Sequence, residues 1–133
     1  MEAIRILLVD DEREATDLLS KRLTRRGCIC RCAHSGEEAL ELLKNQELPK
    51  VVVLDVKMPG IGGLSALETI KSLYPKIEII MLSGHADPDA AVTGLRLGAF
   101  GYVMKPPNFN ELWHLIEDAS RLSALNSEHR EGR

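Results

Sequence analysis

The chain has 133 residues, 44 % of them hydrophobic, which fits one globular domain with an ordinary core. The formal net charge of -3 excludes a general basic field for nucleic acid, and no apolar stretch is long enough to span a membrane. Three cysteines argue against a disulfide framework, and charges interrupt the apolar start as they would not in a signal peptide. We therefore expect a cytoplasmic protein that contacts neither nucleic acid nor membrane directly.

Short apolar runs alternate with segments of helical spacing in the first half of the chain, as buried parallel strands alternate with helices. Gly27 ends the first helical segment, and Ser35 with Glu38 forms a capping box that opens the second. In chain order we expect a strand over 4–9, a helix over 14–26, a strand over 28–33, a helix opened at Ser35, and a strand over 51–54.

The second half repeats the alternation after a loop rich in proline and glycine at residues 58–63. In chain order we expect a helix over 64–73, a strand over 77–82, a helix over 88–97 capped by Asp87, a strand over 100–104, and a helix capped by Asn108. Gly94 should make its helix the least rigid, at a cost of about 1 kcal/mol relative to alanine. We expect one domain over 1–125 and a polar, disordered tail over 126–133.

Five strands alternating with five helices predict an α/β fold with a parallel sheet, right-handed crossovers and helices on both faces. In such a sheet, functional groups gather outside the carboxyl ends of the strands. Asp10 and Asp11 follow the first strand, Asp55 follows the third, and Lys105 follows the fifth. These side chains should meet at one edge. Three acids repel one another unless a cation lies among them, and Mg²⁺ suits their oxygen ligands. A lysine beside them indicates an anion, most simply a phosphoryl group.

The spacing of Cys28, Cys30 and Cys32, extended by His34, is similar to that of a metal site. On one strand these side chains face the same way but extend over about 20 Å. A tetrahedral zinc ion needs its ligands about 2.0–2.3 Å from a single point. We interpret the thiols as small buried hydrophobic groups, with a redox or metal role as the alternative.

Two further features have more than one interpretation. The basic residues Lys21, Arg22, Arg25 and Arg26 end the first expected helix, where they either interact with its negative terminus or dock a partner. Trp113 lies beside the core stripe of the last helix, so it either covers the edge of the core or belongs to an exposed contact surface.

Over about residues 3–122 the chain resembles the receiver domain of bacterial response regulators, the phospho-acceptor of two-component signalling. The matching features, in order, are Val9-Asp10-Asp11, Asp55 followed by Met58-Pro59-Gly60, Ser83-Gly84, Tyr102, and Lys105-Pro106. The resemblance implies a flavodoxin-like, doubly wound sheet of five strands in the order 2-1-3-4-5. It also implies a cis peptide bond between Lys105 and Pro106.

The resemblance assigns a role to each matched residue. Asp55 is expected to accept the phosphoryl group, while Lys105 and Ser83 bind its oxygens. Tyr102 is expected to act with Ser83 as a switch that repacks the face formed by the helix over 88–97, the strand over 100–104 and the last helix. The expected Mg²⁺ ligands are Asp10, Asp11, Asp55 and the main-chain carbonyl of Lys57.

The implied partners are a sensor histidine kinase or phosphotransfer protein, a downstream protein or missing output domain, and a second copy bound through the switching face. Such a domain is no enzyme beyond its own phosphorylation and dephosphorylation. The alternative is a degenerate receiver that only docks proteins. A phosphatase of the haloacid dehalogenase type needs a second acid where Lys57 stands. A nucleotide carrier needs a glycine-rich loop in place of Asp10-Asp11-Glu12.

Overall fold

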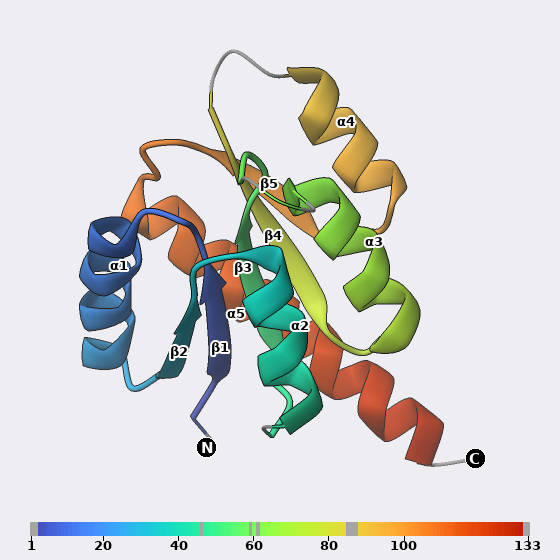
Figure 1. The fold of residues 1–133 in the computed structure, drawn as a ribbon. Coiled ribbons are helices and arrows are strands. Elements are labelled where there is room, and N and C mark those ends of the chain that lie inside the picture. The colour runs from blue at the N-terminus through green and yellow to red at the C-terminus, as the bar shows by residue number, and fades with distance from the viewer. Residues whose placement is uncertain (1–2, 46, 59, 61, 85–87, 132–133) are drawn as a thin grey trace.

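The computed structural model describes residues 3–45, 47–58, 60, 62–84 and 88–131, with side chains as far as Leu125. Within these residues, five strands alternate with five helices along the chain (Figure 1). In chain order the elements are β1 (Arg5–Val9), α1 (Arg13–Arg25), β2 (Ile29–Ala33), α2 (Gly36–Asn45), β3 (Val51–Asp55), α3 (Gly62–Leu73), β4 (Glu78–Ser83), α4 (Pro88–Arg96), β5 (Gly101–Met104) and α5 (Phe109–Glu131).

The strands form one parallel sheet in the order β2-β1-β3-β4-β5, which confirms the predicted fold class and strand order. Leu8 of β1 lies opposite Cys32 of β2 on one side and Val53 of β3 on the other. The direction in which strands are added to the sheet therefore reverses at β1. In open sheets of this kind, ligands bind beyond the carboxyl ends of the strands on either side of such a reversal. Here those strands are β1 and β3.

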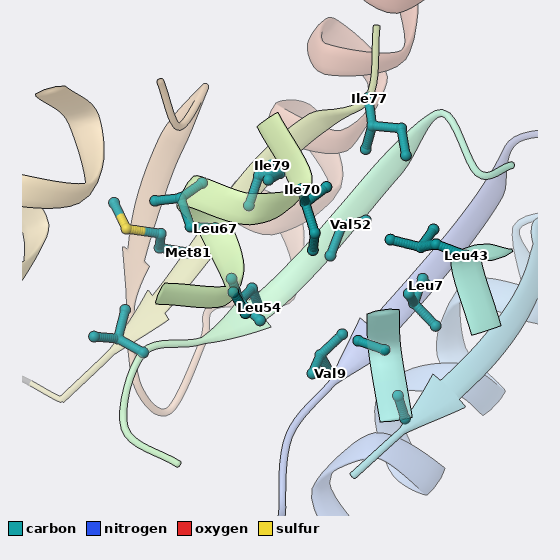
Figure 2. Close-up of a cluster of buried hydrophobic side chains, with 14 of the residues drawn as sticks. Leu7, Val9, Leu43, Val52, Leu54, Leu67, Ile70, Ile77, Ile79 and Met81 are labelled. Atoms are coloured by element: carbon teal, nitrogen blue, oxygen red, sulfur yellow. The ribbon is translucent and has the colours of Figure 1, made fainter. Parts of the chain in front are cut away.

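Two hydrophobic cores lie on opposite faces of the sheet, because side chains alternate along each central strand. Val52 and Leu54 pack with residues of α2, α3 and α4 such as Leu67 (Figure 2). Val53 packs on the other face with α1 and α5, including Ile116. Figure 1 shows the same division, with α1 and α5 on one side and α2, α3 and α4 on the other. Each fully buried aliphatic side chain contributes about 1.5–3 kcal/mol.

Some of the helix-capping hydrogen bonds predicted from the sequence are present in the structure. The N–H of Glu38 donates to Ser35 Oγ at 3.0 Å and that of Glu111 donates to Asn108 Oδ1 at 3.0 Å, so both predicted caps are confirmed. The carboxylate of Glu38 accepts the N–H of His34 instead of completing the capping box at Ser35. The predicted cap Asp87 lies outside the described residues. The Lys105–Pro106 peptide bond is cis, as the resemblance implied.

The carboxyl-terminal segment belongs to the last helix over most of its length. Helix α5 continues to Glu131, and the disorder expected over 126–133 stays a prediction. Residues 126–131 contain no glycine or proline, so nothing in their backbone chemistry ends a helix that has already begun. Nearer its middle, α5 is fastened to the loop before β4, because Ser123 Oγ donates to the carbonyl of Lys76 at 2.8 Å.

The cysteines in β2 and directly before it pack against α1. Cys28 is buried, and Cys30 and Cys32 are partly buried against the same core, which confirms their interpretation as small hydrophobic groups. Burial raises the pKa of Cys30 to about 11, with a further increase from the neighbouring Cys28. These thiols are therefore poor nucleophiles at neutral pH. None of the described helices combines the length and apolar character needed to cross a membrane.

Candidate functional site

The residues predicted to bind the metal or the phosphoryl group stand at or just after the carboxyl ends of parallel strands, whereas the predicted switch residue Tyr102 lies within β5. Asp10 and Asp11 follow β1, Asp55 is the last residue of β3, and Ser83 is the last residue of β4. Lys105 comes directly after β5. Since these strand ends share one edge of the sheet, residues far apart in the sequence are brought into one place.

Three carboxylates gather at this edge. One oxygen atom from each of Asp10, Asp11 and Asp55 lies within 4.8 Å of the others. In the part of the chain that the structure describes, no other three Asp, Glu, His or Cys side chains converge in this way. Asp10 and Asp55 are buried, whereas Asp11 is exposed. A set of oxygen donors with one side open to solvent fits Mg²⁺, which keeps several water ligands.

Lys105 is the counter-ion of this group. Its Nζ lies 2.8 Å from Asp10 Oδ2 and 3.2 Å from Asp55 Oδ2, with the exposed Glu12 carboxylate 3.7 Å away. Burial lowers the pKa of Lys105, but its hydrogen bonds to Asp10 and Asp55 and their charges outweigh that effect and raise it. The ammonium group therefore stays charged at neutral pH.

Asp55 is buried at some electrostatic cost. Burial raises the pKa of this carboxyl group to about 6, the negative charge of Asp10 adds to the increase, and Lys105 partly offsets it. One lysine thus does not fully neutralise the two buried carboxylates. A further cation at this edge would lower the energy of the ionised form.

Backbone hydrogen bonds fix the two buried carboxylates. Asp10 Oδ1 accepts the N–H of Glu12 at 3.0 Å, and Asp55 Oδ1 accepts the N–H of Lys57 at 3.2 Å. These bonds orient the acids without using their second oxygen atoms, which face Lys105.

Ser83 and Lys105 are joined through the main chain. The N–H of Lys105 donates to the carbonyl of Ser83 at 2.8 Å, which ties the end of β4 to the segment after β5. The Ser83 side chain is buried, and its hydroxyl lies 3.2 Å from the carbonyl oxygen of Gly84. A displacement at Ser83 would therefore be passed to β5.

Gly63 supports the site in a way that sequence reasoning missed. A Cβ atom at this position would stand 2.4 Å from the carbonyl oxygen of Asp55 and 2.6 Å from Val56 Cα. The Gly63 N–H donates to the carbonyl of Val56 at 3.0 Å, so the start of α3 packs closely against the backbone around Asp55. The signal in the sequence is the pair Gly62-Gly63, but two adjacent glycines are equally typical of a loop.

Aromatic and basic side chains meet on the surface between α1 and α5. Trp113 is partly buried against the core, which favours its role as a cover for the core edge. The guanidinium of Arg26 lies 5.3 Å from the Trp113 ring and 5.4 Å from that of Phe109, and the guanidinium of Arg22 lies 4.2 Å from the Phe109 ring. Two of the four basic residues at the end of α1 therefore stack on aromatic rings of α5.

A family model described as the response regulator receiver domain matches residues 6–117, most of the chain. The chain belongs to the response regulator receiver family. Receiver domains are phospho-acceptor signalling modules rather than enzymes in the usual sense, and their partners are histidine kinases. The acidic group of Asp10, Asp11 and Asp55 is typical of the receiver magnesium site.

Curated relatives extend the similarity. The DNA-binding transcriptional regulator NtrC of Proteus hauseri is 38 % identical over 119 residues, which are 90 % of this chain and 25 % of that protein. The regulatory protein AtoC of Escherichia coli K12 is 36 % identical over 126 residues, 95 % of this chain and 27 % of that protein. The receiver chain thus spans about a quarter of the length of these relatives.

Solved structures agree with the fold. A CheY-like receiver domain protein from Methanospirillum hungatei superimposes with a TM-score of 0.87 at 29 % identity, over 94 % of this chain and 99 % of that one. NtrX from Brucella abortus, in complex with ADP, superimposes with a TM-score of 0.91 at 33 % identity, over 99 % of this chain and 30 % of that one. The same domain therefore occurs both alone and within a longer chain in solved structures.

Proposed function

We propose that this receiver domain accepts a phosphoryl group on the carboxylate of Asp55, from a sensor histidine kinase or a phosphotransfer protein, in a reaction that requires Mg²⁺. The observation that carries the proposal is the position of Asp55, buried between Asp10 and Lys105 with its Oδ2 3.2 Å from Lys105 Nζ. A buried carboxylate beside both a cationic side chain and an acidic cation site suits transfer of an anionic group.

The proposed magnesium ligands are Asp10, Asp11, Asp55 and the main-chain carbonyl of Lys57. When bound, Mg²⁺ supplies positive charge against the oxygens of the incoming phosphoryl group. The raised pKa of Asp55, about 6, supports this assignment, because a buried acid pair that one lysine leaves incompletely neutralised favours a second cation. The exposed Asp11 leaves that side of the site open to water.

Asp55 needs no general base, because most of it is ionised above its pKa of about 6. In the proposed reaction, a carboxylate oxygen forms a bond to phosphorus while the bond from phosphorus to the donor imidazole nitrogen breaks. The electron pair of that bond stays on the nitrogen. Lys105 and the hydroxyl of Ser83 bind the transferred oxygens, which neutralises the charge on the group as it moves.

The proposed output surface is the face of α4, β5 and α5. Phosphorylation draws Ser83 inward, and the 2.8 Å bond from Lys105 to Ser83 supports a coupled shift of β5, where Tyr102 is exposed. That face also carries the exposed apolar residues Val92, Leu95, Met104 and Leu122. We propose that it binds a downstream protein, an attached output domain or a second copy. Relatives named as DNA-binding regulators favour an attached domain.

Intact mass spectrometry after incubation with acetyl phosphate and Mg²⁺ tests the acceptor. We expect one added phosphoryl group on the wild-type chain, and none when the metal is chelated or when Asp55→Asn replaces the acceptor. Lys105→Ala should reduce the extent of labelling without changing the site.

An adduct that survives in Asp55→Asn would place the acceptor elsewhere. If no adduct forms, beryllofluoride binding followed by NMR separates the remaining cases. Binding of this phosphoryl mimic would indicate an adduct that hydrolyses before detection. No binding would leave a degenerate receiver that only docks proteins.

A further inference from the structure

A cavity of about 250 Å³ lies between α1 and the segment that leads from β5 into α5. Its floor is the carboxyl-terminal part of β1, β3 and β4, and its walls are the inner side of α1 and the residues after Lys105. Most of the lining is apolar. The lining residues that the argument uses are Ala15, Leu18, Leu19, Arg22, Lys105 and Phe109.

The mouth of the cavity combines an apolar rim with one cation, Arg22, that has no acidic partner among the described residues. Leu18, on the rim, is 64 % exposed. Arg22 is exposed and makes no ion pair with any of the described residues, and its guanidinium lies over the Phe109 ring at 4.2 Å. Lys105 and Asp10 at the inner end are already paired with each other. Arg22 is therefore the lining charge available to a ligand.

We propose that this cavity binds a small amphiphilic carboxylate, with its apolar body between α1 and Phe109 and its carboxylate on Arg22. A dry apolar cavity of about 150 Å³ binds benzene, so 250 Å³ admits an apolar body larger than one aromatic ring. Sites of this kind join an apolar lining to a few orienting polar groups. A guanidinium at the mouth selects an anion and disfavours a cation of the same shape.

The occupant would also contact Lys105, because Lys105 lines the inner end of the same cavity. A bound ligand would restrain this side chain and hinder its movement from Asp10 and Asp55 toward a phosphoryl group. The cavity would then be a regulatory site for the acceptor. This consequence, unlike the binding itself, rests on the function proposed above.

Titration of the full chain with octanoate, followed through backbone amide NMR shifts, tests the binding. We expect saturable shifts at Ala15, Leu19 and Phe109. Octanol has the same eight-carbon chain without the charge, and octyltrimethylammonium carries a positive charge on it. Both should therefore bind more weakly than octanoate. Shifts of equal size with all three compounds would overturn the assignment to a carboxylate.

Two variants locate the site. Arg22→Gln should weaken octanoate binding about two- to fivefold, the size expected for one exposed ion pair, while Arg25→Gln on the same helix should not. Ala15→Phe fills the cavity from an exposed position and should abolish the shifts without unfolding the domain. Undiminished binding to Ala15→Phe, or no saturable binding to the wild-type chain, would overturn the proposal.

The regulatory consequence has its own readout. Octanoate should slow labelling of the wild-type chain by acetyl phosphate and Mg²⁺. Binding without any effect on labelling would retain the ligand site and remove its link to Lys105. If the chain is never labelled, the proposed function fails, but the NMR titration still decides whether the cavity binds its ligand.

Discussion

The central strands of the sheet are buried and the edge strands are partly exposed. The candidate functional residues on these strands show the same contrast in burial. Strands β3 and β4 are buried along their whole length and end in Asp55 and Ser83. Strand β5 at one edge is half exposed and carries Tyr102 and Met104. Buried elements open least often, while exposed ones move at little cost. The fold therefore gives Asp55, the proposed acceptor, a buried frame and places the proposed signalling surface on a partly exposed edge strand.

The largest effect is expected where the centre is packed most closely. Gly63→Ala places a Cβ atom 2.4 Å from the Asp55 carbonyl oxygen, and backbone cannot give way as a flexible side chain can. We expect a loss of about 1–3 kcal/mol in the free energy of unfolding, measured with urea, together with weaker labelling by acetyl phosphate.

Ser65→Ala is the matched control, because it changes an exposed residue of the same helix. Normal stability and labelling in Gly63→Ala would mean that the backbone around Asp55 yields more easily than the close packing indicates.

A second effect follows from the buried carboxylate. The pKa of Asp55 rises from 3.8 to about 6 on folding, so its contribution to stability is complete below pH 3.8 and is lost as the pH rises through about 6. In the absence of metal, wild-type stability should fall over this range relative to Asp55→Asn, by an amount on the order of 2 kcal/mol. Urea unfolding in EDTA at a series of pH values measures the difference, and parallel curves would contradict it.

An intermediate effect is expected where α4 packs against the central strand β4. In Gly94→Ala the new Cβ would stand 2.0 Å from Met81 Sδ, although that side chain can partly rearrange. The gain in helix propensity offsets part of the strain, which leaves a net loss of about 1 kcal/mol. The glycine thus serves close packing of α4 on β4.

Met81→Val provides the test of that contact, because it removes the atoms that a residue at position 94 would strike. Adding Gly94→Ala to Met81→Val should cost less than adding it to the wild-type chain, as a thermodynamic cycle measures. Additive losses would mean that the contact with Met81 does not explain the glycine.

The smallest effect is expected at the edge. Tyr102→Ala should change the free energy of unfolding by less than about 1 kcal/mol, because Tyr102 is 37 % exposed on an edge strand. Labelling by acetyl phosphate should be unchanged. A loss as large as that of Gly63→Ala would show that the edge is not the looser region.

The convergence of Asp10, Asp11, Asp55 and Lys105 could be predicted from the sequence, because parallel strands end at one edge of a sheet. The contact of Gly63 with the Asp55 carbonyl could not, since it depends on how α3 approaches β3 in space. The same holds for Arg22 over Phe109, which lie on helices far apart in the sequence.

The expected polar tail over 126–133 rests on a different kind of argument. Polar composition indicates that a segment buries little surface, but it does not indicate that the backbone leaves a helix already begun. The extension of α5 to Glu131 follows from the absence of a breaker residue. Polar composition therefore predicts that a segment is exposed to solvent, but it does not predict whether its backbone is helical.

The strand order has a consequence for how the domain folds. Strands β1 and β3 lie side by side, yet β2 and two helices separate them in the chain, and Lys105 follows the last strand. No two neighbouring strands are joined by a tight turn, so each pairing closes a long loop and folding should be slow for this size. Because the acidic group and its lysine meet only when the sheet is complete, no partly folded form presents the site. Labelling of Asp55 by acetyl phosphate would then also report that the domain has folded completely.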